Sequence, residues 1–144
     1  MLTDCDTARA RNIDRGFTLA RAVFEPARGG RPPLAYTVGL PTPAGRSRFE
    51  LVTCGLLVAF SRRVLTRAAR QLKEDALDPA RGLELDRVIE ENRVRLHRVQ
   101  NTTHFTGVAP TVAFWQVLLP DGWGRFPGDL HYGDWPGQPP QPLL

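Results

Sequence analysis

The strongest pattern in the chain is a repeat of apolar side chains at steps of three and four residues across residues 57–76. This spacing gathers the apolar side chains on one face and predicts an amphipathic helix that packs against a core. Pro79 and Gly82 follow the segment and predict its end. The repeating apolar positions are Leu57, Phe60, Val64, Leu65, Ala68, Ala69 and Leu72.

Three segments before this helix have the character of β-strands. Residues 17–24 alternate in part between apolar and polar side chains, and residues 34–40 carry a β-favouring Tyr-Thr-Val run. The intervening residues 26–33 contain too many prolines and glycines for a regular element. We therefore expect an antiparallel hairpin with a long loop. A third strand is expected over residues 49–54, and Gly55 then permits a tight turn.

The second half of the chain contains one clear strand and one ambiguous region. Residues 112–119 form a near-continuous apolar run, which predicts a strand in a central position of a sheet. Residues 82–99 fit either strands or a short helix followed by a strand near residues 93–98. Asn101 or Thr102 is placed to begin a short helix that would run through Gly107.

These elements together predict an α+β fold. We expect a mixed, mainly antiparallel sheet of about five strands, packed by one long helix and a short helix, with a long C-terminal arm. Residues 1–15 are polar and are expected to be a flexible lead, and residues 16–144 to form a single domain. We also expect the strands at 34–40 and 112–119 to be neighbours, because each runs into a polar loop that would line one pocket.

Composition and charge narrow the classes of function only slightly. The net charge is +4, and of the 19 basic residues only Lys73 is a lysine. The arginines are dispersed among acidic residues, which disfavours nucleic-acid binding. Cys5 and Cys54 are too few for a disulfide framework. No signal peptide or membrane-spanning run is visible, so the cytoplasm is the expected location and no membrane contact is expected.

Several short motifs in a fixed order resemble a known family. They are the segment 34–40, Phe49-Glu50-Leu51-Val52, Gly55-Leu56, Gln116-Val117, Asp121, Gly124-Arg125-Phe126-Pro127 and Gln141-Pro142-Leu143. This set is similar to the bacterial family catalogued as domain of unknown function 4262, over about residues 15–144. The chain has Arg48-Phe49 where that family usually has His-Pro, and Gly128 where it often has Trp. The resemblance implies a fold and a set of positions, but no reaction, cofactor or catalytic residue.

Three residues are candidates for acid/base chemistry: Glu50, His104 and Asp121. Glu50 lies inside a predicted strand, where a buried carboxylate needs a partner. It fits a general base with a raised pKa, but a structural ion pair with an arginine such as Arg125 is the favoured interpretation. His104 lies among polar residues and is the best lone histidine candidate. Asp121 follows Pro120 in a sequence typical of a turn.

Four further residues are candidates for ligand binding: Tyr36, Gln116, Trp123 and Arg125. Trp123 would stack on a ligand and Arg125 would bind an anion, although the same segment fits a hairpin turn whose aromatic side chains cover the edge of the core. Strand alternation directs Tyr36 and Thr37 to opposite faces, so at most one of them touches a ligand.

Cys54 precedes the predicted helix and could be a nucleophile, but a buried, inert thiol is the favoured interpretation. His97, His104 and His131 show no metal-binding spacing, so no metal site is predicted. The chain also lacks a glycine-rich phosphate loop, and no cofactor can be assigned.

Two kinds of function remain from the sequence. The first is binding of, or action on, a small molecule in a pocket between the 34–40 strand and the 121–127 loop. The second is a protein-interaction or accessory module that uses the 26–33 loop and the aromatic C-terminal arm. No single motif dictates a reaction.

Overall fold

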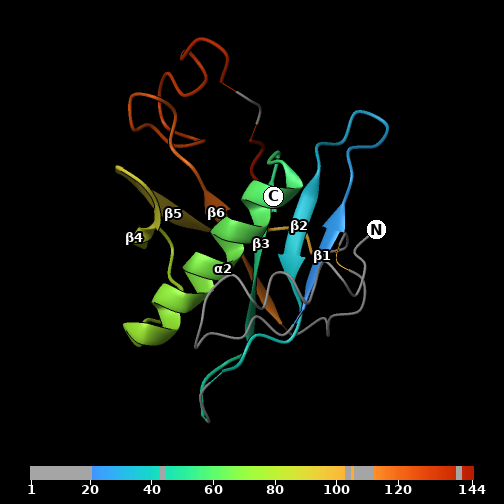
Figure 1. The fold of residues 1–144 in the computed structure, drawn as a ribbon, viewed down its shortest axis with the longest axis vertical. Coiled ribbons are helices and arrows are strands. Elements are labelled where there is room, and N and C mark those ends of the chain that lie inside the picture. The colour runs from blue at the N-terminus through green and yellow to red at the C-terminus, as the bar shows by residue number, and fades with distance from the viewer. Residues whose placement is uncertain (1–20, 43–44, 103–104, 106–111, 139–140) are drawn as a thin grey trace.

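The fold is a six-stranded sheet with one helix across a face, as seen in a computed structural model that describes residues 21–42, 45–102, 105, 112–138 and 141–144 (Figure 1). The spatial order of the strands is β1-β2-β3-β6-β5-β4. The elements are β1 (Ala22–Glu25), β2 (Leu34–Thr37), β3 (Phe49–Cys54), α2 (Val58–Glu74), β4 (Glu84–Ile89), β5 (Asn92–Arg98) and β6 (Ala113–Leu118). The expected α+β class, with a mixed and mainly antiparallel sheet, is confirmed.

The sheet is antiparallel except at its centre, where β3 and β6 run parallel. β6 is therefore central, as its apolar run predicts. β3 lies between β2 and β6, however, so the expectation that the 34–40 and 112–119 strands are neighbours is wrong. The chain from β3 to β6 passes through α2 and the β4–β5 hairpin, which is the crossover that a parallel pair requires.

The direction of the strands defines two ends of the sheet. At one end β2 finishes at Thr37 while β3 and β6 begin at Phe49 and Ala113. At the other end β3 and β6 finish. α2 begins there after β3, and the chain that follows β6, which we call the C-terminal arm, begins there as well. We call these the Thr37 end and the arm end. They are the lower and upper ends of the sheet in Figure 1.

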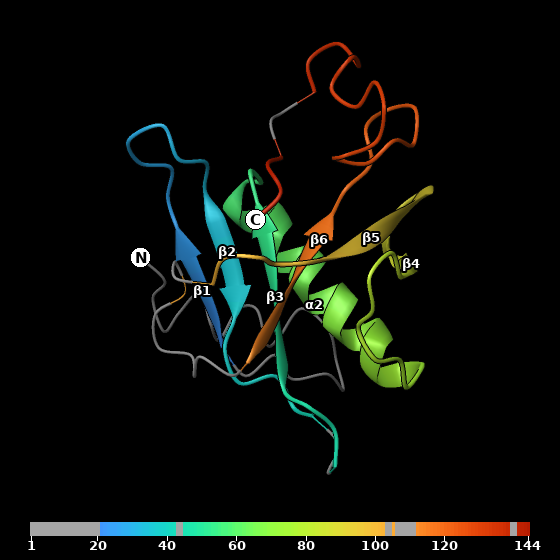
Figure 2. The same ribbon diagram turned by 180° about the vertical axis from the view of Figure 1, so that it is seen from behind.

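The main core lies between α2 and one face of the sheet, and Figure 2 shows the opposite face toward the viewer. Val64, Leu65 and Ala68 of the helix are fully buried against strand residues such as Leu51 and Val117. The helix begins one residue later than predicted. Leu57 is its N-cap and is 82% exposed, so its expected place in the buried stripe is wrong.

A smaller aromatic cluster covers the other face of the sheet. Tyr36 meets Phe105 and Phe114 edge-on at centroid distances of 5.0 and 6.1 Å, and the two phenylalanines stack at 4.0 Å. Val52 and Val99 complete the buried part of this cluster. Strand alternation thus separates Tyr36 from Leu51, which faces α2.

The ambiguous region 82–99 folds as the β4–β5 hairpin, and this raises the number of strands from the expected five to six. Its turn contains Glu91 with a φ of 63°. The third strand has the predicted bounds, 49–54, and β1 pairs with β2 as the expected antiparallel hairpin. The lead at 1–15 and most of the short helix expected at 101–107 lie outside the described residues.

The C-terminal arm is tied to β6 by two glutamine side chains. Gln116 donates from Nε2 to the Pro142 carbonyl at 2.8 Å and accepts from the Leu144 amide at 2.9 Å. Gln141 bonds both the amide and the carbonyl of Leu119, at 2.8 and 2.9 Å. Because each primary amide replaces a pair of backbone bonds, the arm is held across the sheet without forming a strand.

Candidate functional site

Glu50 forms the most elaborate polar arrangement at the Thr37 end of the sheet. Its side chain is 1% exposed, and its carboxylate accepts hydrogen bonds from the Thr37 hydroxyl at 2.8 Å, the Gly39 amide at 2.7 Å and the Leu40 amide at 3.2 Å. A guanidinium nitrogen of Arg48 lies 3.9 Å away. These donors come from the last residue of β2, from the two amides that follow it, and from Arg48, which immediately precedes β3.

The local sequence explains how this arrangement forms. Gly39 has a φ of 82°, which turns the chain so that two successive amides point at one anion. Thr37 sits at the last residue of β2, where its hydroxyl also accepts the Leu51 amide at 2.9 Å. Glu50 therefore fixes the beginning of the loop that joins β2 to β3.

Burial and hydrogen bonding shift the pKa of Glu50 in opposite directions. Burial raises the pKa of Glu50, while the bonds from Gly39, Thr37 and Leu40 and the charge of Arg48 lower it, and the net direction is upward. Arg125, named as an example of the expected ion-pair partner, is instead bound to Asp121. The carboxylate is buried and already accepts three hydrogen bonds, so a proton-transfer role would require this end of the sheet to open.

Asp121 organises a turn at the arm end of the sheet. One of its carboxylate oxygens accepts the amides of Trp123 and Arg125, both at 2.9 Å, and the other accepts Nε of Arg125 at 2.9 Å. Burial acts to raise the pKa of Asp121, but these bonds and the charge of Arg125 outweigh it and hold the pKa below its usual range. The turn expected from the sequence is thus built around a carboxylate whose acceptor positions are filled.

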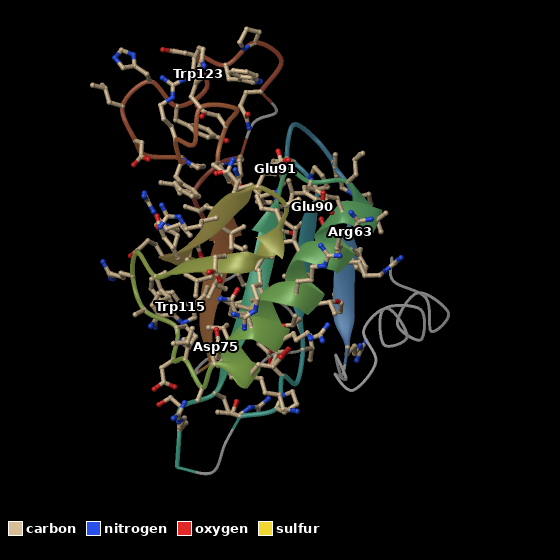
Figure 3. The ribbon with its side chains drawn as sticks, turned by 60° about the vertical axis from the view of Figure 1, so that its left-hand side comes forward. Arg63, Asp75, Glu90, Glu91, Trp115 and Trp123 are labelled. Carbon is tan, nitrogen blue, oxygen red and sulfur yellow. The ribbon has the colours of Figure 1, made fainter. Side chains whose placement is uncertain are left out.

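On the same turn, the Trp123 ring packs between the Arg125 guanidinium and the Trp135 ring. The Arg125 guanidinium lies 4.3 Å from the centre of the Trp123 ring, and Trp135 meets that ring edge-on at 4.9 Å. Trp135 also packs directly on the backbone of Gly122, where a Cβ atom would lie 2.3 Å from the ring. Figure 3 shows Trp123 on the arm, well away from Asp75 at the end of α2.

Tyr36 and Gln116 lie in the interior. Tyr36 is 1% exposed inside the aromatic cluster, and Gln116 is fully buried and holds the tail. The sequence candidates therefore separate into three places: Glu50 at the Thr37 end, Tyr36 and Gln116 within the sheet, and Asp121, Trp123 and Arg125 at the arm end. His104 lies outside the described residues.

A cavity of about 110 Å³ opens beside the loop that joins β2 to β3, whose beginning Glu50 holds and which we call the Glu50 loop. One side of its apolar wall is formed by Leu40 and Pro41 of that loop and by Phe49 at the start of β3. The other side is formed by Ala69 and Leu72 of α2 and by Ala76 and Leu77 of the turn that follows. Thr42, Arg46, Lys73 and Asp78 supply its polar part. No sequence motif predicts this site, although the helical repeat that includes Ala69 and Leu72 indicates part of its wall.

The remaining chemical candidates in the described residues are inert or dispersed. Cys54 is buried, and that burial raises the pKa of its thiol to about 11, away from thiolate character at neutral pH. The described residues contain no group of three or more His, Cys, Asp or Glu side chains arranged to hold a metal ion. Within the same part of the chain, no helix has both the length and the apolar character needed to cross a bilayer.

The described residues define a small α+β protein in which one helix covers a mixed six-stranded sheet. The chain belongs to the family described as Domain of unknown function (DUF4262), whose model matches residues 13–133. Comparison with curated proteins and with solved structures gave no match. The family resemblance seen in the sequence is therefore confirmed, and function must be argued from the site.

Proposed function

We propose that this protein binds a small, mainly apolar molecule bearing one anionic group, in the cavity between the Glu50 loop and the end of α2. The observation that carries the proposal is the cavity itself, which has an apolar wall and a charged rim. This cavity shares Leu40 with the pocket expected from the sequence. Its other side is formed by the end of α2 and the turn after it, and not by the 121–127 loop.

The size of the cavity limits the ligand. At about 110 Å³ it is well below the roughly 300–1,000 Å³ typical of pockets for drug-sized molecules. A short aliphatic chain or a single ring is the appropriate scale. The apolar residues of the wall would supply most of the binding free energy by removing that group from water.

The rim favours a negatively charged group on the ligand. Arg46 and Lys73 are its cations and Asp78 is its anion. Arg46 bonds Asp78 at 2.8 Å, but both side chains are substantially exposed, so this ion pair contributes little and can be exchanged for a ligand carboxylate.

The Glu50 arrangement supports binding by holding the loop in place before the ligand arrives. Leu40 lines the cavity and its amide is one of the three donors to Glu50. A wall fixed in this way loses less conformational entropy on binding. The same occupied carboxylate favours a binding role over catalysis.

The test is a ligand series measured by calorimetry and by NMR, from butanoate to octanoate, with the matching primary alcohols. Affinity should rise with chain length until the cavity is full, and carboxylates should bind more tightly than alcohols. Ala69→Leu should fill the cavity and abolish binding, whereas Ala59→Leu, the same change at an exposed position of α2, should not. Leu77→Ala should enlarge the cavity and shift the preferred chain to a longer one. Equal binding by the Ala69 and Ala59 variants, with no dependence on chain length, would reject the proposal.

A protein-interaction role is the second candidate, and the exposed side chains of the arm favour it. Trp123 is 57% exposed and Leu130 is 80% exposed. A photo-reactive residue at position 130 should capture a defined partner in cells, while the same residue at exposed Glu91 should not. Identical products from the two positions would count against this role.

A further inference from the structure

We propose that a second cavity, in the β1–β2 hairpin, binds a free α-amino acid with an apolar side chain through the opposite charges of Glu25 and Arg28. This cavity has a volume of about 330 Å³, which falls within the roughly 300–1,000 Å³ typical of small-molecule pockets. It opens in the loop between the two strands, at the arm end of the sheet (Figure 2). It shares no residue with the cavity beside Glu50 and does not depend on the function proposed there.

Prolines create the cavity by interrupting the pairing of the hairpin. β1 pairs with β2 as far as Glu25 and Leu34, and pairing resumes only at Arg28 and Arg31. The prolines between these points have no amide hydrogen to donate to a strand pair, so the two segments separate there. Two of these prolines line the cavity that results.

A tight turn at the tip of the loop brings two arginines to the same side. Arg28 and Arg31 exchange backbone hydrogen bonds at 3.1 and 2.9 Å across Gly29 and Gly30, whose φ values are 55° and 79°. Glycine adopts such positive φ values without strain, which permits a turn of only two residues. Directly opposed residues of a hairpin project to one side, and both arginines line the cavity. Because like charges in this arrangement repel each other, an anion bound beside them is stabilising.

Glu25 places a negative charge on the wall of the same cavity. Neither its carboxylate nor the Arg28 guanidinium has an ion-pair or hydrogen-bond partner in the part of the chain that the structure describes. The two groups therefore line one cavity without bonding each other. Opposite charges held apart in this way fit a ligand that carries both charges itself.

The floor of the cavity is apolar. The strand register pairs Glu25 with Leu34 and Val23 with Tyr36, so these side chains share the face of the sheet opposite α2. Val23 and Leu34 are half-buried and pack against the aromatic cluster that contains Tyr36. An aliphatic or aromatic side chain placed on this floor would be removed from water, which favours binding.

These features match an α-amino acid better than a simple anion. Its ammonium group can donate to Glu25, its carboxylate can accept from Arg28, and its side chain can cover Val23 and Leu34. A ligand with a carboxylate alone would leave the charge of Glu25 uncompensated beside its own. The two charges of an α-amino acid are close together, as two protein groups three residues apart on one hairpin require.

The experiment titrates the whole protein with leucine, followed by calorimetry and by amide chemical shifts, which should change most at Glu25, Gly30 and Leu34. Leucinamide lacks the carboxylate and N-acetylleucine lacks the ammonium group, so each should bind roughly fivefold more weakly than leucine. Arg28→Gln should remove the preference for leucine over leucinamide. Glu25→Gln should remove the preference for leucine over N-acetylleucine.

Matched variants control for net charge and for the other cavity. Arg63→Gln on α2 and Glu91→Gln in the β4–β5 turn remove the same charges from exposed positions outside the hairpin (Figure 3) and should leave both preferences unchanged. Ala69→Leu fills the cavity beside Glu50 and should not alter leucine binding, so a failure of one proposal is distinguishable from a failure of the other. Melting temperatures of the variants check that each one folds.

Three results would overturn the proposal. The first is equal binding of leucine, leucinamide and N-acetylleucine, or no response to leucine, valine and phenylalanine. The second is an effect of Glu91→Gln or Arg63→Gln as large as that of the cavity variants, which would make net charge responsible. The third is binding of leucyl-leucine as tight as that of leucine, because its charges lie farther apart and the hairpin would then recognise a peptide.

Discussion

The Thr37 hydroxyl donates a hydrogen bond to the Glu50 carboxylate at 2.8 Å and accepts one from the Leu51 amide at 2.9 Å. One side chain at the end of β2 therefore satisfies both a buried charge and a buried backbone donor of the neighbouring strand. Because Glu50 also binds the Gly39 and Leu40 amides, this contact links the strand pairing to the shape of the next loop.

Thr37→Val should lower the free energy of unfolding by about 1–3 kcal/mol, since it keeps the shape of the side chain and leaves Glu50 and the Leu51 amide each short of a partner. Urea unfolding measures the loss. Thr42→Val provides the control, because its hydroxyl makes only a long bond of 3.4 Å to the Leu40 carbonyl. A loss at Thr37 no larger than that at Thr42 would contradict the assigned role.

Glu50 should make stability fall as the pH rises. Its pKa is raised in the folded protein, so the folded state holds this proton more tightly than the unfolded state does. The resulting contribution is complete below the unfolded pKa of about 4.3 and is lost as the pH rises through the folded pKa. The unfolding free energy of the wild type minus that of Glu50→Gln should therefore decrease with pH across this window. Urea titrations at several pH values measure this difference, and an increase with pH would contradict the assigned shift.

Gly122→Ala should displace Trp135. The added Cβ would lie 2.3 Å from the indole ring, so the ring must leave the turn backbone. The Trp135 ring becomes more hydrated, and its fluorescence emission should move to longer wavelength, with Trp135→Phe identifying the contribution of that residue. The melting temperature should change little, since Trp135 is 37% exposed and belongs to the arm. An unchanged spectrum would show that the arm accommodates the methyl group.

Gln116→Leu should free the end of the chain from the sheet. The substitution is close in volume but removes both bonds to the tail, at Pro142 and Leu144. Hydrogen exchange should accelerate at the amides of Leu144 and Gln100, the latter being bonded to the Leu144 carbonyl. Gln100→Leu keeps that backbone bond and should accelerate exchange much less. Equal exchange in both variants would mean that other contacts hold the tail.

Elements whose pattern is local and repetitive were predictable from the sequence. The repeat across Phe60–Leu72 predicts the buried face of α2, and the short apolar segment at 49–54 predicts β3 with its observed bounds. The region 82–99 remained ambiguous, because runs of this length fit two structures until β5 pairs with β6. Periodicity alone predicts Leu57 on the buried face, but Leu57 is the N-cap, where the helical repeat does not apply.

The α+β class, most of the elements and the polar residues from which a site can be built follow from the composition and spacing of the amino acids alone. Which of these residues come into contact depends on how the elements pack in three dimensions. The placement of β3 between β2 and β6 gives Glu50 to Thr37 and leaves Arg125 with Asp121 at the opposite end of the sheet. The cavity beside Phe49 likewise exists only because α2 returns along the sheet to the Thr37 end. Such contacts depend on strand order and direction, which residues distant in sequence fix only when they pack together.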